Sequence, residues 1–284
     1  MKTDNHFSEV ADTWNNKVWA QDKKFADDIV KFSALKGNEK ALYVGVGTGE
    51  IADKFNVAEM WGLDESPEML EQCKSIDRSR LLCGDAESLP FLDNTFDFVF
   101  CRNLLKHVYE EHLAVEEMKR VLKPGGKVFI AESCVIDEWD AQIPNFVVRT
   151  VEPYHNSFRT HRWYETLCRD SGLKIRSEAI YEYKSVWLSK WIESTGASEE
   201  IKKRILFSYK HAPTDFRIRQ EVKIMDDDIE SIIFWSFIVA EKTGVLSDKD
   251  RGYLKDFFTS MNLWETVKHE SDDSLVKLAG ELIG

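Results

Sequence analysis

The chain has 284 residues, enough for one large domain with an appendage or for two small domains. Its residues are 43% hydrophobic and 31% charged, as in an ordinary soluble protein. The formal net charge of −12 gives no electrostatic support to a general nucleic-acid-binding role. The first residues lack the apolar core of a signal peptide, and no run approaches the roughly 20 apolar residues of a membrane span. We therefore expect a cytoplasmic protein without a membrane span.

The five cysteines, at positions 73, 83, 101, 134 and 168, include no CxxC pair. A structural zinc site needs ligands in close pairs, so we expect no metal. Cys83 and Cys101 lie in apolar, strand-like runs. We expect buried free thiols in a reducing compartment.

The first half of the chain shows a regular alternation. Residues 1–36 read as amphipathic helices that end at Gly37-Asn38. We then expect five strands, at 40–46, 59–65, 80–85, 95–103 and 127–133. Helices are expected between them at 50–56, 67–76 and 110–123. This alternation is typical of a parallel α/β sheet with helices on both faces, in which ligands bind at the carboxyl ends of the strands.

The rhythm changes after residue 134. Residues 135–160 read as irregular and aromatic, followed by a helix to Gly172 and a strand at 174–186. Residues 187–212 read as two helices, and a hairpin is expected around 226–228. We divide the chain into three parts: a helical flap (1–36), a main domain (37–244) with a lid insertion at about 187–218, and a helical extension (245–284).

The stretch "ALYVGVGTGE" places Gly45, Gly47 and Gly49 directly after the first expected strand. Glycines let backbone N–H groups approach a ligand, and the helix expected next would direct its positive end to the same point. The spacing G-x-G-x-G departs from the G-x-G-x-x-G of dinucleotide binders, which favours a ligand without pyrophosphate and disfavours a nicotinamide dehydrogenase.

Two acids stand in register with this loop. Asp64 ends the second expected strand, about 20 residues after the first glycine, at the spacing of an acid that binds ribose hydroxyls. Asp85 ends the third expected strand, where a carboxylate can accept a hydrogen bond from the exocyclic amine of adenine. Together they indicate an adenosine site.

Four segments carry a family resemblance: "YVGVGTGE", "WGLDESPEML", "CGDAESLPFLDNTFDFVFCRNLLKHV" and "RVLKPGGKVFIAE". They cover roughly residues 40–133, and together they resemble class I S-adenosylmethionine-dependent methyltransferases, of the ubiquinone/menaquinone-biosynthesis type and its small-molecule relatives. The resemblance implies a Rossmann-like, seven-stranded, mostly parallel sheet with an N-terminal flap, a lid before the last strand and a helical tail. It also implies methyl transfer to a small-molecule acceptor, with S-adenosylhomocysteine as the product.

The resemblance further implies how the cofactor is held. It places Gly45, Gly47 and Gly49 under the methionine part, Asp64 at the ribose, Glu65 and Met69 near the ribose and adenine, Asp85 and Ala86 at the adenine, and Asn103 facing the cofactor.

Tyr43 departs from this pattern, because relatives usually carry an acid there that contacts the cofactor's amino group. A tyrosine offers one hydrogen bond and no charge at neutral pH, so a charge-assisted partner worth ~1.5–3 kcal/mol is lost. Either another group compensates, or the cofactor binds weakly or differently. Glu50 is near in sequence, and we expect it to point along the helix that follows.

Candidate bases are few. His107 follows the fourth expected strand at the pocket mouth, where Lys106 replaces a histidine often seen in relatives; its other reading is a packing residue. His155 lies in the irregular segment and could equally bond the backbone. Four residues are candidates for the acceptor pocket: Trp14, Tyr154, Trp187 and Arg217. The alternatives are ordinary core or loop positions for the aromatic residues and a solvated strand face for Arg217.

Two other functions stay open. The same fold can carry non-methylating chemistry, as a cyclase or a transferase with a modified cofactor, or the chain can be a catalytically silent binding protein. The extension 245–284 has enough apolar residues to need a packing partner. It either extends the fold or pairs with a second copy in a homodimer.

Overall fold

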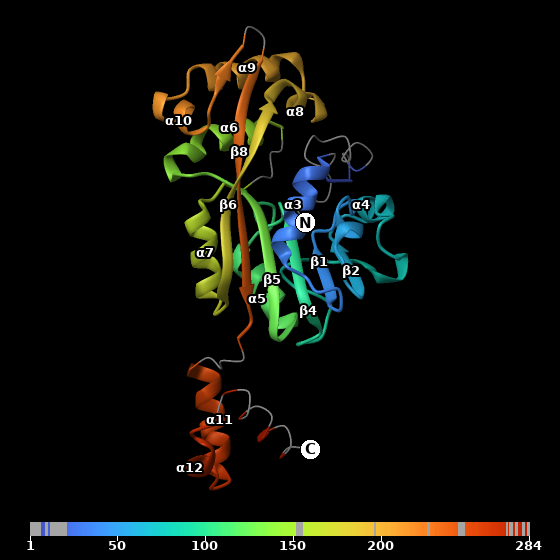
Figure 1. Ribbon diagram of the computed structural model, residues 1–284, viewed down its shortest axis with the longest axis vertical. Coiled ribbons are helices and arrows are strands. Elements are labelled where there is room, and N and C mark those ends of the chain that lie inside the picture. Colours follow the sequence, from blue (N-terminus) through green and yellow to red (C-terminus); the bar gives the residue numbers. More distant parts are fainter. Residues whose placement is uncertain are drawn as a thin grey trace.

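The computed structural model describes residues 7–8, 11, 22–151, 156–195, 197–225, 228–243 and 248–270, together with 272, 275, 278, 279 and 282. In Figure 1, one twisted sheet with helices on both faces forms the centre of the molecule. A group of helices lies beyond one end of the sheet, and the C-terminal helices lie beyond the opposite end.

The sheet has the strand order β3-β2-β1-β4-β5-β8-β6. The bounds are Lys40–Val44 (β1), Glu59–Asp64 (β2), Leu81–Cys83 (β3), Phe96–Arg102 (β4), Leu122–Cys134 (β5), Lys174–Trp187 (β6) and Ile229–Glu241 (β8). The first five strands pair in parallel, whereas β8 runs antiparallel to both β5 and β6. A short strand, β7 (Lys223–Ile224), also pairs with β8. The expected α/β fold with a mostly parallel central sheet is confirmed, and β7 brings the sheet to eight strands rather than seven.

Helices cover both faces of this sheet, each through an apolar side. On one face, α3 (Lys23–Ser33) and α4 (Pro67–Gln72) contribute Phe25, Ile29 and Leu70 to a core cluster. On the other face, α5 (Glu111–Val121) and α7 (His161–Asp170) contribute Met118 and Tyr164. The apolar runs of β1, β4 and β5 are therefore buried on both sides, as expected for parallel strands.

The segment after the glycine loop differs from the expectation. The helix expected at 50–56 is only a 3₁₀ turn, η2 (Ala52–Lys54). The chain must reach β2 at Glu59, and Ala58 N already bonds to Glu39 O at 3.0 Å, which leaves too few residues for a crossover helix. The prediction that a helix directs its positive end at the loop is therefore wrong.

The segment expected to be irregular contains two helical elements, η4 (Glu138–Ala141) and α6 (Gln142–Val151). Pro144 falls in the first turn of α6, where a missing N–H is tolerated, so it does not break the helix. Three more helices follow β6: α8 (Leu188–Ser194), α9 (Glu199–Lys210) and α10 (Thr214–Arg219). We call α6, α8, α9 and α10 the helical cap, because residues of α6, α8 and α9 share an apolar cluster and all four lie beyond one end of the sheet (Figure 1).

The expected hairpin lies on either side of 226–228, as β7 and the start of β8. Arg217, expected beside a strand, lies in α10 instead. Beyond β8, α11 (Asp248–Ser260) and α12 (Trp264–Val267) belong to a separate small cluster around Phe258, Leu275 and Ala279. No helix in the described part of the chain has the length and apolarity to cross a membrane.

All five cysteines are free, and four of them are buried. Cys83 is the exception to the expected burial, because it ends β3, the outermost strand on its side of the sheet.

Candidate functional site

The glycine loop after β1 has a backbone conformation that is unfavourable for residues with a side chain. Gly45, Gly47 and Gly49 have φ angles of +68°, +54° and +74°, in the region that favours glycine. A Cβ on Gly45 would come within 2.8 Å of the Leu104 side chain, and one on Gly49 within 2.4 Å of Ser75 Oγ. Both glycines are thus also required by close packing within the protein.

Asp64 fastens this loop to the end of β2. One carboxylate oxygen accepts from Gly47 N at 2.7 Å, and the other from Ser66 N at 3.0 Å. Burial raises the pKa of Asp64 to about 6, against the lowering effect of these two bonds. A carboxylate has about four lone-pair sites, so further acceptor positions are left for the hydroxyls of a ribose.

The end of β3 offers a second acceptor. Asp85 is exposed and accepts from Glu87 N at 2.8 Å, while Ala86 beside it is buried. Glu65 is exposed and Met69 is buried in α4. The loop, Asp64 and Asp85 follow three neighbouring parallel strands, so they lie along one edge of the sheet.

Tyr43 does not face this edge. It is 1% exposed and packs against Phe100, with ring centroids 4.7 Å apart, in the core cluster beneath α3. Burial raises its pKa to about 12. Position 43, where the resemblance predicts a cofactor contact, is thus a buried tyrosine whose side chain interacts electrostatically with Arg102 and Asp64.

Beneath the loop, Glu50 and Arg102 form an ion pair in which both side chains are buried. Glu50 therefore points into the protein, because no helix follows the loop to carry it outward. Arg102 also lies close enough to Tyr43 to oppose the rise in the tyrosine's pKa. Its Nη1 is buried without a hydrogen-bond partner among the described residues. The acid missing at position 43 is thus replaced nearby by a carboxylate that already has a cationic partner.

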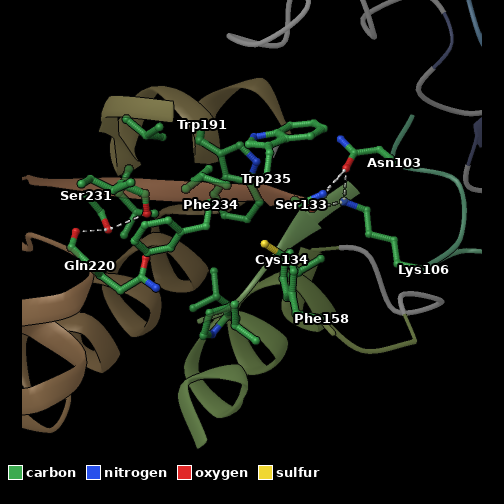
Figure 2. Close-up of a pocket in the computed structure, with 18 of the residues that line it drawn as sticks. Asn103, Lys106, Ser133, Cys134, Phe158, Trp191, Gln220, Ser231, Phe234 and Trp235 are labelled. Atoms are coloured by element: carbon green, nitrogen blue, oxygen red, sulfur yellow. Dashed lines mark hydrogen bonds between the residues drawn. The ribbon is translucent and has the colours of Figure 1, made fainter. Parts of the chain in front are cut away.

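A cavity lies where β5 and β8 meet the helical cap (Figure 2). It holds about 960 Å³ of empty space, a figure that includes open solvent at its mouth. Its lining is mostly apolar and includes Cys134, Val147, Phe158, Leu188, Trp191, Ile232, Phe234 and Trp235. The turn after β4 contributes the polar residues at one end, namely Asn103, Lys106 and His107.

The end of the cavity nearest β4 is a compact polar group. Lys106 Nζ donates to Asn103 Oδ1 and to Ser133 Oγ, both at 2.8 Å. Figure 2 shows these three side chains converging. Lys106 is only 8% exposed, and its ammonium lies 5.4 Å from the centroid of the Phe158 ring. Asn103 has φ +51°, a conformation that asparagine tolerates better than most residues. A positive charge is therefore held inside a largely apolar cavity.

Glu132, on β5, holds the turn after β4 in place through hydrogen bonds to its backbone. Its Oε1 accepts from the backbone N of Leu104 at 2.6 Å and of Leu105 at 2.9 Å. Its side chain is fully buried, which raises the pKa of Glu132 to about 7, although the charge of Lys106 opposes the rise.

The opposite end of the cavity is lined by Gln220 and Tyr209, from α10's C-terminus and α9. Figure 2 places Gln220 well away from Lys106, with Phe234 between them. Burial raises the pKa of Tyr209 to about 12, so its hydroxyl stays protonated. The cavity thus has hydrogen-bonding groups at both ends of an apolar middle.

Only some of the candidate residues for acceptor binding and base catalysis line the cavity. His107 lines the cavity, and its ring meets Phe7 edge-on with centroids 5.1 Å apart. Trp187 and Arg217 are not among the lining residues. Trp14, Tyr154 and His155 lie outside the described residues.

Sequence reasoning missed several lining residues that carry polar groups: Ser133, Tyr209, Gln220 and Trp235. Lys106 was noticed only as a replacement for histidine. Ser133 and Trp235 belong to strands whose burial could be predicted. That their side chains line a cavity could not, because the cavity exists only where the helical cap encloses them.

A second cluster lies outside the cavity lining. His161, Glu165 and Glu178 bring potential ligand atoms within 4.8 Å of one another. His161 Nδ1 contacts Ser236 Oγ at 2.8 Å, and Glu165 pairs with Arg169 at 2.9 Å. These contacts account for the cluster as a hydrogen-bond and salt-bridge network.

Comparisons with known proteins agree on a family. Residues 42–130 match the profile of a family described as a methyltransferase domain. The uncharacterized methyltransferase YcgJ of Bacillus subtilis is 28% identical over 222 residues, which cover 72% of this chain and 85% of YcgJ. The demethylmenaquinone methyltransferase of Staphylococcus aureus is 36% identical over 138 residues, covering 45% of this chain and 57% of that protein.

Solved structures agree on the fold. A candidate methyltransferase from Bacillus halodurans superposes with a TM-score of 0.71 at 22% identity, covering 78% of this chain and 99% of that chain. The structure of YcgJ gives a TM-score of 0.69 at 23% identity, over 77% of this chain and 97% of its own.

Proposed function

The chain carries a methyltransferase domain, and we propose that it transfers a methyl group from S-adenosylmethionine to a small-molecule acceptor bound in the cavity. The observation that carries this proposal is the turn after β4. Leu104 packs against Gly45 of the glycine loop, while Asn103, Lys106 and His107 line the cavity. A cofactor on the loop and an acceptor in the cavity would therefore lie on either side of one short turn.

The residues present fit the adenosine part of such a cofactor. Asp64 has acceptor capacity left for ribose hydroxyls, and the exposed Asp85 suits the adenine amine. At the amino end, Tyr43 is turned into the core, so the usual contact from this position is absent. When bound, the cofactor supplies a methyl group activated by a sulfonium.

The chain's own contribution is mainly positional. A displacement in line with the breaking bond gains most from holding two reactants in the correct geometry without water. The cavity wall from Ser133 to Val135 and the cap residues Trp191 and Leu188 exclude water on the acceptor side. We propose the cap as the lid of the acceptor site. His107, and His155 if the acceptor needs a second group, are the proposed bases. The free cysteines suit a cytoplasmic location.

Cofactor binding tests the proposal. S-adenosylhomocysteine at millimolar concentration should raise the melting temperature of the protein, because a ligand stabilises the state it binds. Asp64→Ala should raise the Kd by about tenfold or more, since it removes hydrogen bonds to a charged acceptor. Glu71→Ala, at an exposed position of α4 outside the proposed site, is the control and should change the Kd much less.

The pH dependence gives a sharper readout. The ionised carboxylate is the form that accepts two ribose hydroxyls, and the pKa of Asp64 is about 6 in the free protein. Affinity should therefore be full above pH 6 and fall as the pH drops through 6, and Asp64→Ala should lose this fall. No stabilisation by either the cofactor or its demethylated product would refute the proposal. Binding without methyl transfer to any acceptor would favour non-methylating chemistry or a silent binding protein.

A further inference from the structure

The cavity lining includes a lysine. Lys106 lies there beside His107, and none of the described lining residues is Asp or Glu. Glu132 lies behind the wall, is fully buried and uses Oε1 to hold two backbone amides. An acceptor group next to the β4 turn therefore meets a cation and no carboxylate from these residues.

Hydrogen-bond donors gather at the same end. Ser133 and Trp235 are directly paired across β5 and β8, and both line the cavity. The indole Nε1 of Trp235 is buried and has no hydrogen-bond partner among the described residues. A buried donor without a partner costs about 1–3 kcal/mol, which a bound acceptor atom would relieve. Lys106 Nζ is a further donor, and it holds Ser133 Oγ, whose own hydroxyl donates to Asn103 Oδ1 at 3.1 Å.

We propose that the methyl acceptor is a weakly acidic hydroxy compound, a phenol or an enol on an apolar body, and that it reacts as its oxyanion beside Lys106, Ser133 and Trp235. This inference rests on the proposed function. The hydroxyl proton passes to His107, the proposed base, as the acceptor binds. An oxygen lone pair then forms a bond to the methyl carbon while the carbon–sulfur bond breaks, and its electron pair returns to sulfur to leave a neutral thioether.

The rest of the cavity matches such a compound. Phe234, Trp191 and Val147 offer apolar and aromatic surface to a flat body. Gln220 and the protonated Tyr209 at the opposite end can bond a second oxygen of the acceptor. A cationic amine is a poor occupant, because Lys106 would repel it where the low dielectric strengthens repulsion.

Two probes of similar size distinguish these chemistries. Umbelliferone is a fluorescent phenol whose absorbance reports ionisation, and naphthylmethylamine is an apolar ammonium. The wild-type protein, saturated with S-adenosylhomocysteine, should bind umbelliferone more tightly than the amine and lower the phenol's pKa by about one unit, because a nearby cation favours the charged form. Lys106→Met should abolish that pKa shift, and Trp235→Phe should reduce it.

Two controls separate local from general effects. Lys190→Met removes an exposed lysine of α8 and should leave the phenol's pKa shift intact. Gln220→Leu should weaken umbelliferone binding without changing the shift. The proposal is overturned if umbelliferone fails to bind, if its pKa is unchanged on binding, or if Lys106→Met keeps the full shift. Stabilisation by S-adenosylhomocysteine alone, measured on the same samples, reports separately on the proposed function.

Discussion

Arg102 interacts with the Tyr43 side chain and forms an ion pair with Glu50. The side chains of Glu50 and Arg102 are 8% and 4% exposed, so the pair sits almost entirely out of water. Removing one partner from a buried ion pair leaves an unpaired charge in a low-dielectric environment. The ion pair therefore stabilises the structure next to the glycine loop only while both partners are present.

Glu50→Ala should lower the free energy of unfolding by about 3–5 kcal/mol, because Arg102 would stay buried and unpaired. Urea denaturation measures this loss. The double variant Glu50→Leu with Arg102→Met should recover most of the stability, since it removes both charges and keeps the volume. Equal losses in the single and double variants would contradict this account.

Some side-chain positions at the site could be predicted from the sequence, and others could not. Asp64 and Asp85 could be placed because a strand end fixes where a side chain lies, and the structure puts both at the expected edge. The inward turn of Tyr43 and Glu50 could not be predicted, because it depends on α3 and on the absence of a helix after Gly49. The setting of Lys106 depends in part on Ser133, which is 27 residues away in the chain but accepts from the lysine ammonium at 2.8 Å.

The elements of the sheet follow local rules that a single sequence displays. Ser66 caps α4, which has Pro67 at its first position, and its Oγ accepts from Met69 N at 3.2 Å. Ser198 likewise caps α9. The helical cap was harder to predict from the sequence, because α6 and α10 are stabilised by contacts between segments far apart in the chain. Arg219 of α10 bonds both carboxylate oxygens of Asp140 in η4, at 2.8 and 2.6 Å.

This bond joins two elements of the region that closes the cavity. Asp140 is 2% exposed, so losing Arg219 would leave its charge buried. Arg219→Met should therefore speed amide exchange in η4 and α10 by about tenfold or more, while β4 and β5 stay protected. Hydrogen exchange with mass spectrometry makes the comparison. Arg176→Met, at an exposed pair with Glu241, is the matched control. Unchanged exchange in η4 would show that apolar packing alone holds the cap.

On the scale of the whole molecule, the C-terminal helices stand apart. The described residues of their apolar cluster all come from the extension itself, including Leu254, Trp264 and Phe258. In Figure 1 they lie beyond the end of the sheet opposite to the cap. The expectation that the extension packs on the main domain or on a second copy stays a prediction.

A chain ending at Thr243 should keep the melting temperature of the main domain and its affinity for S-adenosylhomocysteine. The reason is that the glycine loop and the described residues lining the cavity all lie outside the extension. If the extension pairs two copies, light scattering should give a dimer mass for the full chain and a monomer mass for the shortened one. A loss of cofactor affinity on truncation would show that the extension supports the site.

The turn at 103–107 has a consequence for how turnover is organised. It contacts Gly45 through Leu104, walls the cavity through Asn103 and Lys106, and is fastened to β5 by Glu132. A movement of this turn when one half of the site fills must reach the other half, and thermodynamic linkage makes that influence mutual. Initial-rate kinetics should then show ordered binding, in which the first reactant to bind raises the affinity for the second.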